Sequence, residues 1–155
     1  MQAVYRRQVR VPDAVLFLGD GLRDLDAGDF PASTLFAVQG NCDMTPRMAD
    51  GGTVSDELLL SFEGHRLLLS HGHRYHVKSG VGAILSRAVR AGADLVLFGH
   101  THMPICKRIP EGTVVGGVEI SHPIYLFNPG SIGQGGSFGT LSLCGEQVLF
   151  SHGNV

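Results

Sequence analysis

The sequence predicts an α/β fold in which stacked β-sheets of mixed strand direction are flanked by helices. Short apolar runs, each closed by glycine and a polar residue, recur along the whole chain and are typical of buried strands. Helical periodicity is confined to residues 80–91, and strand patterns dominate the second half of the chain. The 155 residues are enough for one domain with a sizeable core.

The first predicted elements are a helix end and two buried strands. Residues 1–10 have the pattern of a helix tail, and their three arginines indicate a solvated surface. Residues 14–18 form an apolar run that ends in Gly-Asp, and residues 34–38 form a second run followed by Gly-Asn-Cys-Asp. Residues 48–57 are predicted to form a surface loop.

A hairpin is predicted next. Residues 58–62 and 66–70 flank a short loop with a glycine, residues 63–65, and this arrangement favours an antiparallel pair. His65 is interpreted as a solvated residue of that turn. The second strand ends in His-Gly-His at residues 71–73.

One helix and four strands complete the prediction. Apolar residues at i, i+3, i+4, i+7 and i+8, beginning at Val81, form one face of a helix that Gly92 ends. A strand over residues 94–98 follows and ends in Gly-His-Thr-His. The later strands are predicted over 124–127, 139–143 and 147–150, and the turn Asn128-Pro129-Gly130-Ser131 closes the first of these.

Composition argues against several classes of function. The chain is 43% hydrophobic and 17% charged with a net charge of −2, so no strong attraction to nucleic acid or anionic membranes is expected. No apolar run approaches the roughly 18 residues of a membrane span, and no signal-peptide pattern opens the chain. Cys42, Cys106 and Cys144 are odd in number and far apart, which predicts a reducing, cytoplasmic setting.

Four predicted strands end in side chains that can bind a metal ion: Asp20, Asn41, His71 and the pair His100/His102. Ligands gather outside the carboxyl ends of strands in α/β sheets, so these side chains are expected to converge. Carboxylate, amide oxygen and imidazole suit Mn²⁺, Fe²⁺, Zn²⁺ or Ni²⁺ better than Ca²⁺. Each residue taken singly is equally typical of a turn, a helix cap or a solvated position. Four such strand ends together are a much stronger signal.

Five motifs resemble, in this order, those of the calcineurin-like metallophosphoesterase superfamily, and most closely its small bacterial and archaeal phosphodiesterases: Gly19-Asp20, Gly40-Asn41-Cys42-Asp43, His71-Gly72-His73, Gly99-His100-Thr101-His102 and Asn128-Pro129-Gly130-Ser131. The resemblance runs from about residue 11 to the C-terminus. It implies a two-sheet sandwich between helical layers (αββα) and two divalent ions about a bridging carboxylate. The activity that it implies is metal-dependent hydrolysis of a small phosphate ester, first of all a phosphodiester.

The resemblance also assigns the ligands. Asp20 would bridge the two ions, and Asn41, His71 and His100 would complete the second site. His102 would belong to the first site. The expected ion is Mn²⁺, with Ni²⁺, Zn²⁺, Fe²⁺ and Mg²⁺ as alternatives.

Further roles follow from the same resemblance. Asn41, Asp43 and His73 would take part in catalysis, Asp43 and His73 by orienting ligands or bound phosphate. Cys42 stands where larger relatives often carry a histidine that assists the leaving group. Substrate specificity would lie in the loops 44–57 and 103–123, where no recognisable motif is present.

One part of the family pattern is absent. The family opens with a strand carrying Asp-x-His, which supplies two more ligands to the first site, whereas residues 1–19 contain Asp13 and no histidine. We therefore expect residues 1–155 to form a single metallophosphoesterase-like domain, N-terminally truncated, whose first metal site keeps only Asp20 and His102. Because the absent strand lies inside the family's sheet, its loss would expose unpaired strand edges, and a homo-oligomer is open as an expectation.

Three explanations of this absence are open. The first is a mis-called start codon or an otherwise shortened chain. The second is a true short protein that uses the fold as a catalytically impaired interaction scaffold, as the retromer subunit of this fold does. The third is an enzyme that works with a single metal ion.

Overall fold

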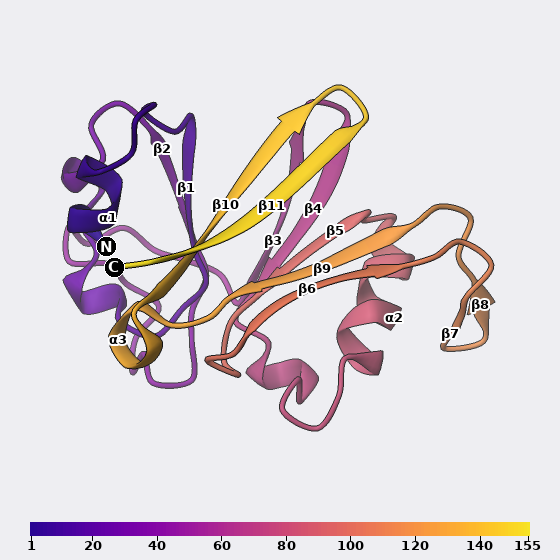
Figure 1. The fold of residues 1–155 in the computed structure, drawn as a ribbon. Helices are drawn as coiled ribbons and strands as arrows, with labels where there is room; N and C mark the ends of the chain where they lie inside the picture. The colour runs from indigo at the N-terminus through magenta and orange to yellow at the C-terminus, as the bar shows by residue number, and fades with distance from the viewer.

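The computed structural model describes residues 1–155 and arranges them in four layers (Figure 1). Two layers of β-strands face each other in the middle of the molecule, and their apolar side chains form one shared cluster. Helical segments cover the outer side of each layer. The predicted αββα sandwich is therefore confirmed. No helix has the length and apolar character needed to cross a membrane.

The larger β-layer is a five-stranded mixed sheet in the order β3-β4-β5-β9-β6. Strands β4, β5 and β9 are parallel, and β3 and β6 pair antiparallel with their neighbours. Parallel pairing brings the carboxyl ends of β4, β5 and β9 to the same edge of the sheet. The five strands are β3 (Glu57–Phe62), β4 (His65–Ser70), β5 (Leu95–Phe98), β6 (Pro104–Ile109) and β9 (Ile124–Pro129).

Helix α2 (Gly82–Ala91) covers the outer face of this sheet. Its buried residues Ile84 and Ala88 belong to the same apolar cluster as Val96 and Phe98 of β5. The alternate residues of β5 point into the other cluster, between the β-layers, so both faces of the strand are buried. The predicted helix is confirmed, and Gly92 ends it in the left-handed conformation (φ 63°).

The second β-layer consists of two separate strand pairs. β1 (Ala14–Phe17) pairs in parallel with β2 (Thr34–Ala37), and β10 (Ser137–Cys144) pairs antiparallel with β11 (Gln147–Asn154). Both pairs pack on the same face of the larger sheet. The outer side of β1 and β2 is covered by α1 (Gln2–Arg6) and by two single-turn helices, η1 (Leu22–Asp24) and η2 (Ala27–Asp29).

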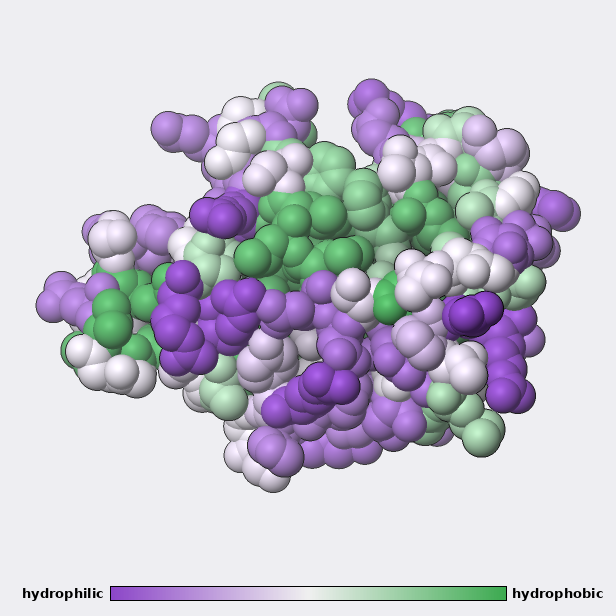
Figure 2. Space-filling view, turned by 180° about the vertical axis from the view of Figure 1, so that it is seen from behind, coloured by the Kyte–Doolittle hydropathy of each residue, from purple (hydrophilic) through white to green (hydrophobic).

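The second β-layer is not continuous, because β1 bonds to no strand other than β2 and β10 to none other than β11. Each of these strands therefore has one edge without a partner strand. The cluster between the layers is also incompletely covered, and a broad apolar patch is visible at the surface (Figure 2). The half-buried apolar residues that pack against the buried cluster are Leu16, Leu18, Phe36, Leu58, Leu60, Phe62, Tyr125, Leu141, Leu143, Val148 and Phe150.

Four expectations about the elements need correction. The segment 103–123 is not a plain loop, because it contains β6 and the small hairpin of β7 (Val114–Val115) and β8 (Val118–Glu119). Asn128 and Pro129 belong to β9, where a turn was predicted. His65 is the first residue of β4 and half-buried, so it is not solvated in the turn. Strands β10 and β11 are longer than predicted because the hairpin continues past the apolar run into polar residues.

Candidate metal centre

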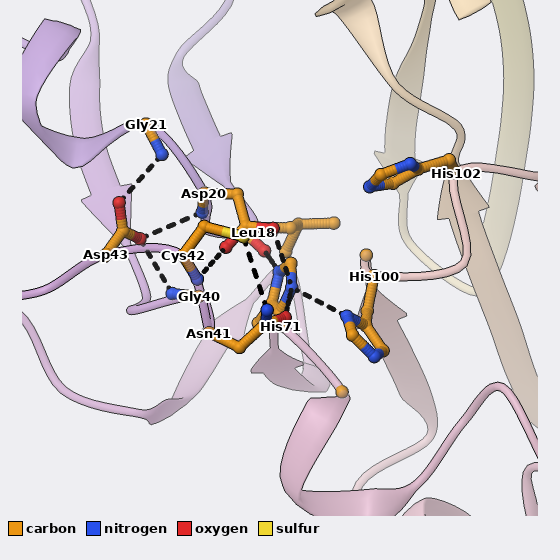
Figure 3. A network of polar contacts seen from close by, with 12 residues as sticks. Leu18, Asp20, Gly21, Gly40, Asn41, Cys42, Asp43, His71, His100 and His102 are labelled. Atoms are coloured by element: carbon orange, nitrogen blue, oxygen red, sulfur yellow. Dashed lines mark hydrogen bonds and ion pairs between the residues drawn. The ribbon is translucent and has the colours of Figure 1, made fainter. Parts of the chain in front are cut away.

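The predicted ligands come from loops at the carboxyl ends of β1, β2, β4 and β5 (Figure 3). Three of them have left-handed backbone conformations, which are uncommon for residues other than glycine: Asp20 (φ 63°), His100 (φ 66°) and His102 (φ 58°). Such conformations cost about 1–3 kcal/mol each and gather at functional sites, where the surrounding structure holds them.

The Asp43 carboxylate holds the Asp20 and Asn41 loops together. It accepts hydrogen bonds from four backbone N–H groups, those of Asp20 (2.9 Å), Gly21 (2.8 Å), Leu22 (2.9 Å) and Gly40 (2.8 Å). Burial acts to raise the pKa of Asp43, but these donors together hold the pKa below its ordinary value. The charged carboxylate is thus engaged with the backbone, and Asp43 fixes the loops that carry Asp20 and Asn41.

The two loops approach so closely that glycine is required at their contact. A Cβ atom on Gly40 would lie 2.1 Å from Asp20 Oδ1, and one on Gly19 would lie 2.8 Å from His71 Nδ1. The backbone N–H of Cys42 donates to Asp20 Oδ1 (2.8 Å). This bond fixes the carboxylate, whose other oxygen, Oδ2, lies near His71.

His71 is the buried member of the ligand set, with a relative exposure of 2%. Its Nδ1 lies 2.6 Å from the carbonyl oxygen of Leu18. A carbonyl oxygen can only accept, so Nδ1 carries the proton of the ring. Burial lowers the pKa of His71, which favours the neutral ring. The remaining nitrogen, Nε2, then carries an unshared electron pair.

Three atoms that could bind a metal ion lie close to His71 Nε2: Asn41 Oδ1 at 3.1 Å, His100 Nδ1 at 3.2 Å and Asp20 Oδ2 at 3.3 Å. An amide oxygen and a carboxylate oxygen can only accept hydrogen bonds, and here they face the electron pair of a nitrogen. In the neutral ring, no proton lies between these oxygens and Nε2. A bound cation would turn these unfavourable contacts into favourable ones, so the donor set fits a metal ion.

The spacing of the donors also fits an ion. Ligand atoms about 2.0–2.2 Å from one ion are about 2.8–3.6 Å apart in octahedral or tetrahedral geometry. The three separations from His71 Nε2, 3.1–3.3 Å, lie inside that range. No group of three or more His, Cys, Asp or Glu side chains is already arranged to hold an ion. Asn41, one of the four candidate ligands, contributes a neutral amide oxygen.

The structure does not join His102 directly to the other ligands. Its ring faces the group around Asp20 and His71 from the opposite side (Figure 3), and its Nδ1 lies 2.8 Å from Gln134 Oε1. Among residues 1–155, Asp20 and His102 remain the only candidate ligands of the first site that the resemblance predicts. Two protein ligands hold a divalent ion less firmly than the four donors around the second position.

His73 and Cys42 border the centre without belonging to the donor set. The ring of His73, in η3 (His73–Tyr75), is centred 5.4 Å from that of His71 and 6.2 Å from that of His100. Its Nδ1 is buried without a hydrogen-bond partner, which is costly for a polar atom. Cys42 is exposed, and the negative charge of Asp20 raises the pKa of its thiol.

Sequence reasoning missed Asn128 as part of the site. Its side chain is fully buried and donates to the Gly99 carbonyl (2.8 Å) and to Thr101 Oγ1 (3.0 Å), while its Oδ1 accepts from the Gly130 N–H (2.9 Å). The bonds tie the end of β9 to the loop that presents His100. The motif Asn-Pro-Gly predicts a turn, and only the parallel pairing of β5 with β9 shows that this asparagine supports the neighbouring strand's loop.

Comparison with known proteins identifies the family of the chain. The sequence profile of the calcineurin-like phosphoesterase superfamily domain matches residues 1–146. The chain is 29% identical over 132 residues to the probable metallophosphoesterase YsnB of Bacillus subtilis, a match that covers 85% of this chain and 66% of that protein. It is 28% identical over 131 residues to the phosphodiesterase YfcE of Escherichia coli, covering 76% of this chain and 56% of that protein.

The fold is shared with solved structures as well. Wild-type Vps29 of Entamoeba histolytica in complex with zinc superposes with a TM-score of 0.65 at 20% sequence identity, over 99% of this chain and 89% of that protein. This similarity concerns the fold. Together with the profile match over most of the chain, it leads to one conclusion: the chain belongs to the calcineurin-like phosphoesterase superfamily.

Proposed function

We propose that this protein is a metal-dependent phosphoesterase that hydrolyses phosphodiesters. The observation that carries the proposal is the convergence of Asn41 Oδ1, His100 Nδ1 and Asp20 Oδ2 on Nε2 of His71. Family membership and the names of the curated relatives support the reaction class. The chain spans about two thirds or less of those relatives' length, so the activity is inferred for this protein and not carried over.

Asp20, Asn41, His71 and His100 would hold the ion. Their mixture of oxygen and imidazole nitrogen favours Mn²⁺, and Ni²⁺, Zn²⁺, Fe²⁺ and Mg²⁺ are the alternatives to be compared. When bound, a divalent ion in such a set lowers the pKa of a coordinated water and polarises a phosphoryl oxygen. The chain's own contribution is to hold the loops of Asp20 and Asn41 through Asp43 and the ring of His71 through the Leu18 carbonyl.

Other side chains would act on the substrate. Burial lowers the pKa of His100, and the positive charge of Lys78 lowers it further. The charge of Lys78 therefore acts at the centre. Such a charge would attract the anionic phosphate of a small ester. The buried, unpartnered Nδ1 of His73 is a further polar atom beside the ligand rings, and orientation of bound phosphate is the role that we propose for this residue.

The proposal is for one firmly held ion. Asp20 and His102 are the only candidate ligands of the other position among residues 1–155, so we propose that it binds an ion more weakly than the position around His71. We also propose a cytoplasmic location, since Cys42, Cys106 and Cys144 are all exposed and unpaired, as suits a reducing compartment.

The test is hydrolysis of bis-p-nitrophenyl phosphate with and without Mn²⁺, combined with the metal content of the purified chain. The proposal predicts metal-stimulated hydrolysis that is lost in His71→Ala. A second candidate is an interaction scaffold on the same fold, which the likeness to Vps29 favours. A folded chain that retains no ion at saturating Mn²⁺ and hydrolyses nothing would support the scaffold and contradict the enzyme.

A further inference from the structure

His102 is held by a side chain from an element that contributes no predicted ligand. Its Nδ1 lies 2.8 Å from Oε1 of Gln134, which belongs to the single-turn helix α3 (Ile132–Gly135). An amide oxygen can only accept a hydrogen bond, so a neutral His102 in this contact carries its proton on Nδ1. Its Nε2 is then free of a proton.

Gln134 is itself fixed by its own turn. Its backbone N–H donates to Ser131 Oγ (3.2 Å), the N-cap of α3. The Ser131 N–H donates in turn to Oγ of the buried Ser137 (3.0 Å), and the Ser137 N–H donates to the Ser131 carbonyl (3.1 Å). This closed set of bonds anchors α3 to the start of β10. The backbone of Gln134 is thus held by a bonded turn, and its exposed side chain reaches from this turn to His102.

The structure assigns Gln134 the role of a positioning residue that selects the tautomer and the orientation of His102. Figure 3 shows the His102 ring directed toward the group around Asp20 and His71, and the contact with Gln134 makes Nε2 the nitrogen able to bind there. In free histidine the tautomer protonated on Nε2 predominates, and that tautomer would present a hydrogen to an ion. The inference rests on the proposed function insofar as His102 is taken as a metal ligand.

Orientation by a neighbouring side chain matters more for His102 than for His71. The His71-centred donors are fixed by burial and by several loops, whereas His102 is half-buried and meets Asp20 in no direct contact. The partner that holds the second nitrogen of a metal-binding histidine typically changes metal affinity by about 10–100-fold. We expect an effect of that size on zinc binding at His102.

The test uses the whole chain labelled with ¹⁵N in its histidine rings. Long-range ¹H–¹⁵N spectra report the tautomer of each ring without any metal, and His102→Ala identifies the His102 signals. The wild type should show Nδ1 protonated, Gln134→Glu should retain that tautomer because it keeps an acceptor oxygen, and Gln134→Leu should shift toward Nε2 protonation. Gln147→Leu, at an exposed position of β11, is the matched control and should leave the His102 signals unchanged.

A Zn²⁺ titration of the same samples separates this inference from the proposed function. We expect the dissociation constant reported by the His102 ring to rise about 10–100-fold in Gln134→Leu, while the His71 and His100 rings respond as in the wild type. Nε2 protonated in the wild type, or a tautomer and zinc response unchanged in Gln134→Leu, would overturn the role of Gln134. A wild type whose His71 and His100 signals ignore Zn²⁺ would instead overturn the proposed function, whatever the tautomer of His102.

Discussion

His71 is the residue on which the candidate centre depends, because all three donor contacts share its Nε2. We predict that His71→Ala and His100→Ala each weaken Mn²⁺ or Zn²⁺ binding by more than about 100-fold, since loss of an indirect partner alone costs about 10–100-fold. Calorimetric titration measures the effect. His122→Ala, at an exposed position, is the control. Loss of binding in the control but not in His71→Ala would show that the ligands are misassigned.

Gly40 offers a test of how the ligand loops are held. A Cβ at this position would lie 2.1 Å from Asp20 Oδ1, so the loop or the carboxylate has to move. Gly40→Ala should therefore lower both metal affinity and the free energy of unfolding, the latter by about 1–3 kcal/mol as for other overpacked sites. Gly82→Ala meets no atom within 4 Å and should leave both quantities nearly unchanged. Urea unfolding and metal titration of the two variants would show any failure of this expectation.

His65 joins the two β-layers at a distance from the centre. Its Nδ1 lies 2.5 Å from Asp94 Oδ2, next to the larger sheet, and its Nε2 lies 2.9 Å from the carbonyl of Gly145, in the β10–β11 turn. Only the charged ring donates from both nitrogens. The hydrogen bond with Asp94 raises the pKa of His65 above its ordinary value. Burial acts to lower the pKa, but its effect is smaller.

A pH dependence follows from this raised pKa. The stabilisation is fully present below the ordinary pKa of histidine, about 6.5, and is lost as the pH rises through the higher pKa of the folded state. His65→Ala should therefore destabilise the protein more at about pH 6 than at about pH 9, and metal affinity should not change. Urea unfolding across that range gives the answer. Equal destabilisation at both ends would mean that the charged ring does not link the layers.

At the scale of the elements, the unpaired edges of β1 and β10 are the unusual feature of the fold. Strand edges beside a half-exposed apolar surface are sites of association between chains. We predict concentration-dependent self-association in sedimentation velocity, which Leu143→Lys should reduce by placing a charge on the half-buried apolar face of β10. Leu149→Lys, on the exposed side of β11, is the control and should have no such effect. A wild type that stays monomeric at all concentrations would contradict this account.

The elements that could be predicted from the sequence are those with a strong local pattern. The runs at β1, β2 and β5 are almost wholly apolar and end before glycine or polar residues, so type and position were both predictable. The apolar parts of β4 and β9 were also predictable, but the polar residues His65, Asn128 and Pro129 that belong to these strands were not. Strand β6 was missed because it lies at the edge of the sheet. Its residues Cys106, Lys107 and Arg108 are exposed, and this leaves no apolar alternation to detect. Its pairing with β9 depends on residues far along the chain.

The candidate centre was likewise predictable only in part. The ligand types at Asp20, Asn41, His71 and His100 are visible because each follows a predictable strand. Their supports are not visible, because Asn128, Gln134 and the Leu18 carbonyl reach the ligands only through tertiary contacts. The prediction that His65 is a solvated turn residue was wrong for the same reason, since its partners lie 29 and 80 residues away.

At the scale of the whole molecule, the centre lies where both β-layers end. β1 and β2 supply the oxygen donors Asp20 and Asn41 from one layer, and β4 and β5 supply the imidazoles of His71 and His100 from the other. Correct packing of the two layers is therefore a condition for a complete donor set. Loss of a contact between the layers, such as that of His65, lowers stability first. It affects the centre only if the layers then move apart.

Anomalous diffraction from crystals grown with Mn²⁺ tests the central claim most directly, because it locates the ion without assuming any activity. The account predicts one strong peak in contact with Asp20, Asn41, His71 and His100, and at most a weaker one between Asp20 and His102. The strong peak should vanish in His71→Ala crystals. Well-ordered wild-type crystals with no peak beside His71, or with manganese bound only at another part of the molecule, would contradict the account.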